Sequence, residues 1–253
     1  MKRKKKNTKA SSPTESRPKS EKVITVLYWF TFLSFLVPVV FLIWQIAVTD
    51  PERIYEEGFR SRADYVLMLV QCLLGILVLH LPGFLTRRFK LAIPNLLYIL
   101  YILFLYCAIF LGEVRNFYFL IPHWDIILHA FSSVMTGLFG FMVVTVLNQT
   151  KITPVHLSPF FVALFSFAFA VTVGTLWEIY EFSFDGLLGM NMQKFLTENG
   201  TALIGRQALS DTMEDLIVDC LGALAASLTG YFSLKHQRGW LYDYMQEDSA
   251  SPK

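Results

Sequence analysis

The chain has 253 residues, of which 54% are hydrophobic and only 17% are charged, and its mean hydropathy is +0.47. This composition excludes a water-soluble globular domain and predicts a membrane protein. The net charge of +2 hides an asymmetry, because nine Lys and Arg lie within the first 22 residues. The positive charge belongs to a tail, and no nucleic-acid partner is predicted.

Residues 1–22 are predicted to form a disordered, basic cytoplasmic tail. The segment has almost no apolar residue that a folded core could bury. Its Lys and Arg favour retention on the cytoplasmic side of the membrane. They also allow contact with anionic lipid, at about 1 kcal/mol for each basic residue near the surface.

Apolar runs of about 20 residues can cross roughly 30 Å of hydrocarbon as helices. Six such runs follow the tail, at about residues 23–48, 64–85, 91–112, 125–148, 158–184 and 212–234. The first run is too long for a signal peptide and no small-residue cleavage site follows it, so we expect an anchor. The sequence therefore predicts an all-α polytopic membrane protein, with a bundle of about six transmembrane helices over 23–234 and a short cytoplasmic tail over 235–253.

The loops predict the orientation of this bundle. With the amino terminus inside, 16 Lys and Arg fall on the cytoplasmic side and six on the outer side. Both termini are therefore expected in the cytoplasm, and the protein is expected to be a multi-pass protein of a bacterial cell membrane, surrounded by the lipid bilayer.

Polar residues concentrate on one stripe of each of the last three predicted helices, because residues three and four apart share a helix face. Each stripe carries acids or histidine at one end and small residues, such as Gly140, Gly174 and Gly222, toward the other. Small residues let helices approach closely in lipid. The acidic ends should then converge in one outward-facing pocket. Its candidate metal-binding residues are His123, Asp125, His129, Glu178, Glu181, Asp211, Asp215 and Asp219.

Some of these acids have a simpler explanation. Asp125 and Asp211 are expected to begin helices, where a carboxylate caps free N–H groups, and Asp211 with Glu214 resembles a capping box. Capping does not explain Glu178 and Glu181, because they lie at a helix carboxyl end, where the helix dipole disfavours anions. Asp219 is expected about 12 Å inside its helix, where an unpaired carboxylate costs roughly 2.5–3.5 kcal/mol.

So many acids in one pocket must be neutralised. Either several carboxylates are protonated or cations balance them. Arg206 is the nearest basic residue along the chain, and one arginine is too few. A divalent metal cofactor fits better, because imidazole with carboxylate oxygens suits Zn, Mn or Fe, whereas carboxylates alone suit Mg or Ca.

Three short patterns carry a resemblance to known families. They are Asp125-xxx-His129, then Trp177-Glu178-xx-Glu181, and then Arg206-xxx-Ser210-Asp211-xxx-Asp215-xxx-Asp219-xx-Gly222-Ala223. They resemble the uncharacterised bacterial family that includes the YjdF-like inner-membrane proteins, over about residues 25–235, and more distantly the VanZ-like proteins, over about 120–235. The resemblance implies a multi-pass membrane fold with a shared pocket, and it implies no established reaction.

Three classes of function are compatible with these residues. The first is a metal-dependent enzyme acting on a lipid or cell-envelope substrate, with Glu178, Glu181 and Asp215 as catalytic candidates and His129 or His123 as ligand or acid. The second is a small transporter coupled to ions or protons, and the third is a membrane assembly or partner-binding protein. The loop 186–210 either covers the pocket or is a plain surface loop.

Overall fold

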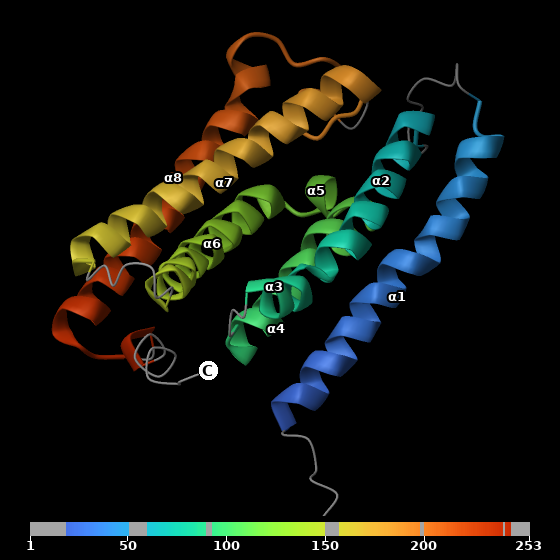
Figure 1. The fold of residues 1–253 in the computed structure, drawn as a ribbon. Helices are drawn as coiled ribbons and strands as arrows, with labels where there is room; N and C mark the ends of the chain where they lie inside the picture. The colour runs from blue at the N-terminus through green and yellow to red at the C-terminus, as the bar shows by residue number, and fades with distance from the viewer. Residues whose placement is uncertain are drawn as a thin grey trace, which may run out of the picture.

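The computed structural model describes residues 19–50, 60–89, 93–149, 157–197, 200–239 and 241–243. The predicted disordered tail, 1–22, lies outside it up to residue 18, and its last four residues are helical instead, because α1 begins at Lys19. Within these ranges the chain is helical, and the one antiparallel bridge pairs Leu196 with Ala202. Six helical stretches are long and apolar enough to span a membrane. The predicted all-α, polytopic class is confirmed. The start of α1 and the end of α8 lie at the same end of the bundle (Figure 1).

The first three spans are built from five helical segments. These are α1 (Lys19–Val48), α2 (Arg62–Leu79), α3 (Leu81–Phe89), α4 (Asn95–Leu105) and the π-helix η1 (Tyr106–Val114). The second span is interrupted at His80, two residues before Pro82, whose ring disfavours an uninterrupted helix. The π-helix was not predicted, and such segments are rare and concentrate at functional sites.

Large apolar side chains hold the first three spans together. Phe35 of α1, Cys72 of α2 and Ile102 of α4 are fully buried in one hydrophobic cluster. The start of α2 is fixed by a reciprocal capping box, in which the Ser61 hydroxyl accepts from the Asp64 amide and the Asp64 carboxylate accepts from the Ser61 amide.

The last three spans are α6 (Trp124–Gln149), α7 (Pro159–Leu188) and α8 (Arg206–His236), preceded by the short α5 (Phe117–Leu120). These three helices pack closely on one another, and α6 also contacts α4 and η1 of the first group (Figure 1). Helix α8 begins at Arg206, six residues earlier than predicted. Because of this extra length, Asp211 and Asp215 lie inside the helix and not at its first residues.

Small residues allow this close packing, as the sequence predicts. A Cβ at Gly140 would lie 2.9 Å from the Ser166 Cα, so α6 and α7 touch through their backbones there. The Ser166 hydroxyl donates a 2.5 Å hydrogen bond to the Gly137 carbonyl. A Cβ at Gly137 would likewise lie 2.7 Å from that of Ala226 on α8.

Candidate functional site

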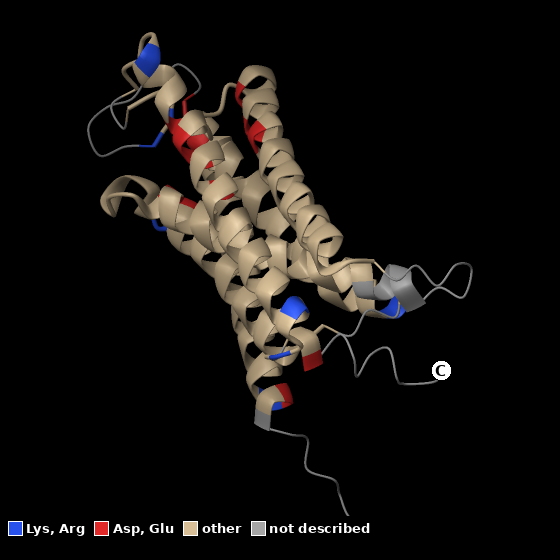
Figure 2. Ribbon diagram, turned by 90° about the vertical axis from the view of Figure 1, so that its left-hand side faces the viewer, with Lys and Arg blue, Asp and Glu red and all other residues tan. Residues whose placement is uncertain are grey.

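Acidic residues from three helices gather at one end of the bundle, the end opposite the start of α1 (Figure 2). They come from the first turns of α6, the last turns of α7 and the first half of α8. The residues that the structure brings together are Asp125, His129, Glu178, Glu181, Asp211, Asp215 and Asp219. We call this group the acidic cluster.

His129 is the centre of the acidic cluster. Its Nδ1 lies 3.3 Å from the Asp219 carboxylate, which fixes the ring orientation when Nδ1 carries the proton. The other ring nitrogen, Nε2, faces three further carboxylates, at 3.8 Å from Asp125, 3.8 Å from Glu178 and 3.9 Å from Asp215. In that tautomer the Nε2 lone pair points toward oxygens that can only accept hydrogen bonds.

Glycines let the acids reach this position. A side chain at Gly174 would collide with the Asp219 carboxylate, which therefore lies directly against the α7 backbone. A side chain at Gly222 would collide with the Ser133 hydroxyl of α6. The small residues below the acidic cluster thus set the distance between the helices that carry it.

Several buried oxygens of the acidic cluster have no hydrogen-bond partner among the described residues. Both carboxylate oxygens of Glu178 are in this condition, as are Asp215 Oδ2 and Asp219 Oδ1. Glu178 is 4% exposed and Asp215 is 2% exposed, so bulk water does not compensate. A buried carboxylate without a partner is costly, and either a proton or a bound cation would offset this cost.

The geometry permits a metal ion at this point. Ligand atoms of His129, Glu178 and Asp215 lie within 4.8 Å of one another, and so do those of Asp125, Asp211 and Asp215. Two ligand atoms at about 2.0–2.2 Å from one zinc ion can be no more than about 4.4 Å apart. The 3.8 and 3.9 Å separations from His129 Nε2 lie inside that limit.

Two of the sequence interpretations are wrong in detail. Asp211 does not cap α8, because that helix begins five residues earlier and Gly205 is its N-cap residue. Glu214 does not complete a capping box either; its carboxylate accepts a hydrogen bond from the Ser210 hydroxyl at the surface. Asp125, by contrast, does lie in the first turn of α6.

His123 is not part of the acidic cluster. It precedes α6 with a positive φ of 60° and its side chain is exposed. Its position two residues before Asp125 suggested a ligand, but the chain reverses direction there before the helix begins.

Asp185, one turn beyond Glu181 on α7, shapes the loop that follows. Its carboxylate accepts hydrogen bonds from the backbone amides of Met192, at 2.7 Å, and Gln193, at 2.9 Å. Met190 and Met192 are buried against Leu67 of α2. The Asn191 side chain both donates to and accepts from the backbone of Leu196. Part of the predicted loop 186–210 is therefore folded back onto both halves of the bundle.

This folded loop delivers a cation that the sequence interpretation missed. The Lys194 ammonium lies 4.4 Å from the centre of the Tyr118 ring and donates to the Met192 carbonyl. Burial alone would lower the pKa of Lys194, but nearby carboxylates raise it above its ordinary value. Those carboxylates are Glu113, Asp125, Glu181 and Asp211. The expected cation, Arg206, is exposed.

Glu113 and Tyr118 complete the surroundings of Lys194. Glu113 is half-buried near the end of η1, and Tyr118 lies on α5. Burial raises the pKa of Tyr118 well above its ordinary value, and the charges of Asp125 and Glu113 raise it further. The phenol therefore stays neutral beneath the ammonium group.

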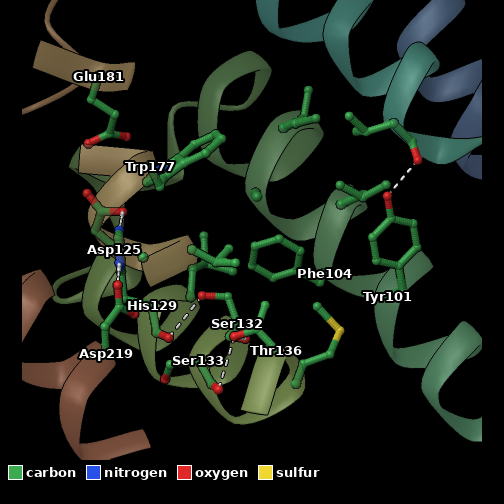
Figure 3. Close-up of a pocket in the computed structure, with 18 of the residues that line it drawn as sticks. Tyr101, Phe104, Asp125, His129, Ser132, Ser133, Thr136, Trp177, Glu181 and Asp219 are labelled. Atoms are coloured by element: carbon green, nitrogen blue, oxygen red, sulfur yellow. Dashed lines mark hydrogen bonds and ion pairs between the residues drawn. The ribbon is translucent and has the colours of Figure 1, made fainter. Parts of the chain in front are cut away.

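A cavity of about 240 Å³ begins at the acidic cluster and runs between the two halves of the bundle. Asp125, His129, Glu181 and Asp219 line one end of it, with Trp177 beside Glu181 (Figure 3). Away from that end the wall is mainly apolar. The hydroxyls of Ser132, Ser133 and Thr136 donate to carbonyls of their own helix (Figure 3).

Comparison with known proteins places the chain in a family. The model of the DUF2238 family, described as a predicted membrane protein, matches residues 29–236. A protein of Thermotoga maritima described as uncharacterized is 33% identical over 114 residues, which cover 44% of this chain and 50% of that relative. The chain thus matches about half the length of this relative. No solved structure matches the chain. Because the family match extends from the first span to the end of the sixth, the chain belongs to the DUF2238 family of predicted membrane proteins.

Proposed function

We propose that the protein is a membrane-embedded enzyme that uses a divalent metal ion to act on a lipid or cell-envelope substrate. One observation carries this proposal. His129 Nε2 faces the buried carboxylates of Glu178 and Asp215, and both oxygens of Glu178 lack a hydrogen-bond partner among the described residues. A divalent ion supplies the partner that these oxygens need and offsets the cost of burying them together.

In this proposal each residue has a defined part. His129, Glu178 and Asp215 are the metal ligands, and either Asp125 or Asp211 adds a further oxygen. Asp219 is a positioning residue, because its contact with His129 Nδ1 leaves Nε2 free to bind. One imidazole with several carboxylates favours Zn, Mn or Fe over Mg or Ca.

The remaining acid, Glu181, is the proposed general base. It is buried, it lines the cavity, and it lies outside both groups of candidate ligands. A bound divalent ion would polarise a carbonyl or phosphoryl oxygen of the substrate. Glu181 would take the proton from the attacking water.

The cavity wall favours this class over an ion or proton carrier. A carrier needs polar groups that continue from the acidic cluster toward the opposite end of the bundle. Beyond the cluster, the described hydroxyls of Ser132, Ser133 and Thr136 are engaged with helix carbonyls. The Tyr101 hydroxyl donates to the Val78 carbonyl in the same way.

We also propose, from the sequence patterns alone, that the family is related to the YjdF-like proteins and more distantly to the VanZ-like proteins, and that both termini face the cytoplasm of a bacterium. Two differences from the VanZ pattern, Ile126 in place of Lys and Asp219 in place of Asn, separate this chain from that group. The acidic cluster would then face outward.

Elemental analysis of the purified protein tests the proposal. We expect roughly one divalent ion per chain, and a loss of about tenfold or more in His129→Ala and Asp215→Asn. Glu214→Gln is the matched control, since Glu214 is exposed, adjacent to Asp215 and bonded to Ser210. Absence of metal from the wild-type protein, after purification without chelator and re-addition of Zn or Mn, would overturn the proposal and favour protonated acids in an assembly or carrier role.

A further inference from the structure

A second cavity continues the first one toward the opposite end of the bundle. Its volume is about 250 Å³, and it lies between α3, α4, α6 and α7. The two cavities share four lining residues, Tyr101, Met135, Thr136 and Val173. The two cavities therefore adjoin, and we call the pair the groove; the acidic cluster lies at one end of it.

The chemistry of the groove changes along its length. The first cavity is lined by His129 and by the carboxylates of Glu113, Asp125, Glu181 and Asp219, whereas none of the described residues that line the second is Asp, Glu, Lys, Arg or His. Phe139 and Phe169 lie in the second cavity. A site that is ionic at one end and hydrocarbon-like along the rest matches an amphiphile.

The length of the groove also suits such a ligand. Asp125 and Phe139 mark its two ends on the single helix α6, and 14 residues of helix span about 21 Å. This exceeds one leaflet of a hydrocarbon core that is about 30 Å thick. Val173 and Trp177 line the groove and are also exposed, so it opens sideways from α7 toward the lipid.

We infer that this groove holds a hydrocarbon chain of a membrane lipid whose headgroup lies beside His129, which lines the groove and joins it to the proposed metal site. The inference rests on the proposed function and names its substrate class, an amphiphile that enters from the bilayer. The hydrocarbon chain of the lipid would fill the apolar second cavity at little cost in solvation, because it never leaves a hydrocarbon environment.

Photolabelling tests this inference. The protein is reconstituted in vesicles of phosphatidylglycerol and phosphatidylethanolamine that contain a trace of phosphatidylglycerol with a diazirine near the end of one acyl chain. Adducts are then mapped by mass spectrometry. We expect them to concentrate on Met135, Phe139 and Phe169. An even spread over lipid-facing residues, such as Phe41 and Trp44 of α1, would overturn the inference.

A paired substitution sharpens this test. Val173→Trp fills the part that both cavities share. We expect groove labelling to fall roughly tenfold, because a lipid chain that loses the burial of about two methylene groups binds about tenfold more weakly. Leu176→Trp is the control, since Leu176 is exposed on the same helix and does not line the groove. Equal labelling of the two variants would contradict the inference. Labelling of the unaltered protein keeps the test valid if Val173→Trp fails to fold.

The same labelling of Glu178→Gln separates this inference from the proposed function. Groove labelling that persists in that variant supports the lipid groove whether or not the protein binds metal. A metal-containing wild-type protein with no groove labelling would overturn the groove and leave the metal site intact.

Discussion

The two halves of the molecule each supply three membrane spans, but they bury different side chains. Large apolar residues fill the core of the first half, where the buried polar side chains among the described residues are Thr31 and Gln71. Every buried acid of the described residues belongs to α7 or α8. Burying these carboxylates costs free energy, and the first half has no such cost among its described residues. Buried acids of this kind are typical of a functional site in a membrane protein.

The halves also differ in how their helices meet. In the first, rings and branched chains such as Phe35 and Ile102 fill the space between the helices. In the second, Gly140 lies against the backbone of Ser166, Gly137 against the Cβ of Ala226 and Gly174 against the Asp219 carboxylate. Close contact places carboxylates of different helices within ion-binding distance. The small residues and the acidic cluster therefore depend on each other, because the close helix contact that the small residues allow brings the carboxylates of different helices together.

The largest effect is expected from a methyl group added to the helix contact of the second half. In Gly140→Ala the new Cβ would lie 2.9 Å from the Ser166 backbone, which cannot move aside cheaply. We expect a loss of about 1–3 kcal/mol in the free energy of unfolding, measured in detergent micelles, together with loss of bound metal. Gly83→Ala on α3 is the control, since nothing lies within 4 Å of its Cβ. Equal stability of the two variants would contradict the packing described here.

A smaller effect is expected from Lys194→Met, which removes the internal counter-cation. Without metal, we expect a loss of about 1–2 kcal/mol, well below the value for a fully buried pair because Lys194 is only half-buried. Divalent ions should bind more tightly to this variant, because a competing positive charge is gone. Thermal unfolding with chelator and with added Zn or Mn measures both effects.

Lys235→Met is the matched control for that experiment. Lys235 also lies over a tyrosine ring, that of Tyr231 at 5.3 Å, but it is exposed in the last turn of α8, far from the acids. Its removal should change neither stability nor metal affinity measurably. If Lys194→Met behaves like Lys235→Met, then Lys194 does not neutralise the acidic cluster.

Much of this architecture could be predicted from the sequence. Apolar runs locate the six spans to within a few residues at most ends, because length and hydropathy determine membrane crossing. Helical periodicity places Glu178 with Glu181, and Asp215 with Asp219, on the faces that turn inward. The small residues on the same faces predict that those helices touch.

The parts that could not be predicted depend on irregular backbone. Lys194 lies over the Tyr118 ring in a loop that Asp185 holds through two backbone amides, and Lys194 itself adopts a positive φ of 50°. Glu113 lies in a π-helix, whose wider turn changes the helix face on which a side chain lies, so a period of 3.6 residues does not predict its direction. His123 is turned away by its own left-handed backbone. Hydropathy and helical periodicity do not encode these conformations.

The most direct test of the central claim is X-ray absorption at the edge of the metal bound to the purified protein. We expect one imidazole nitrogen at about 2.0–2.1 Å together with carboxylate oxygens at about 2.0–2.2 Å. The imidazole signal should disappear in His129→Ala and persist in Glu214→Gln. A shell of oxygens with no imidazole, or a spectrum unchanged by His129→Ala, would show that the acids around His129 do not form the metal site.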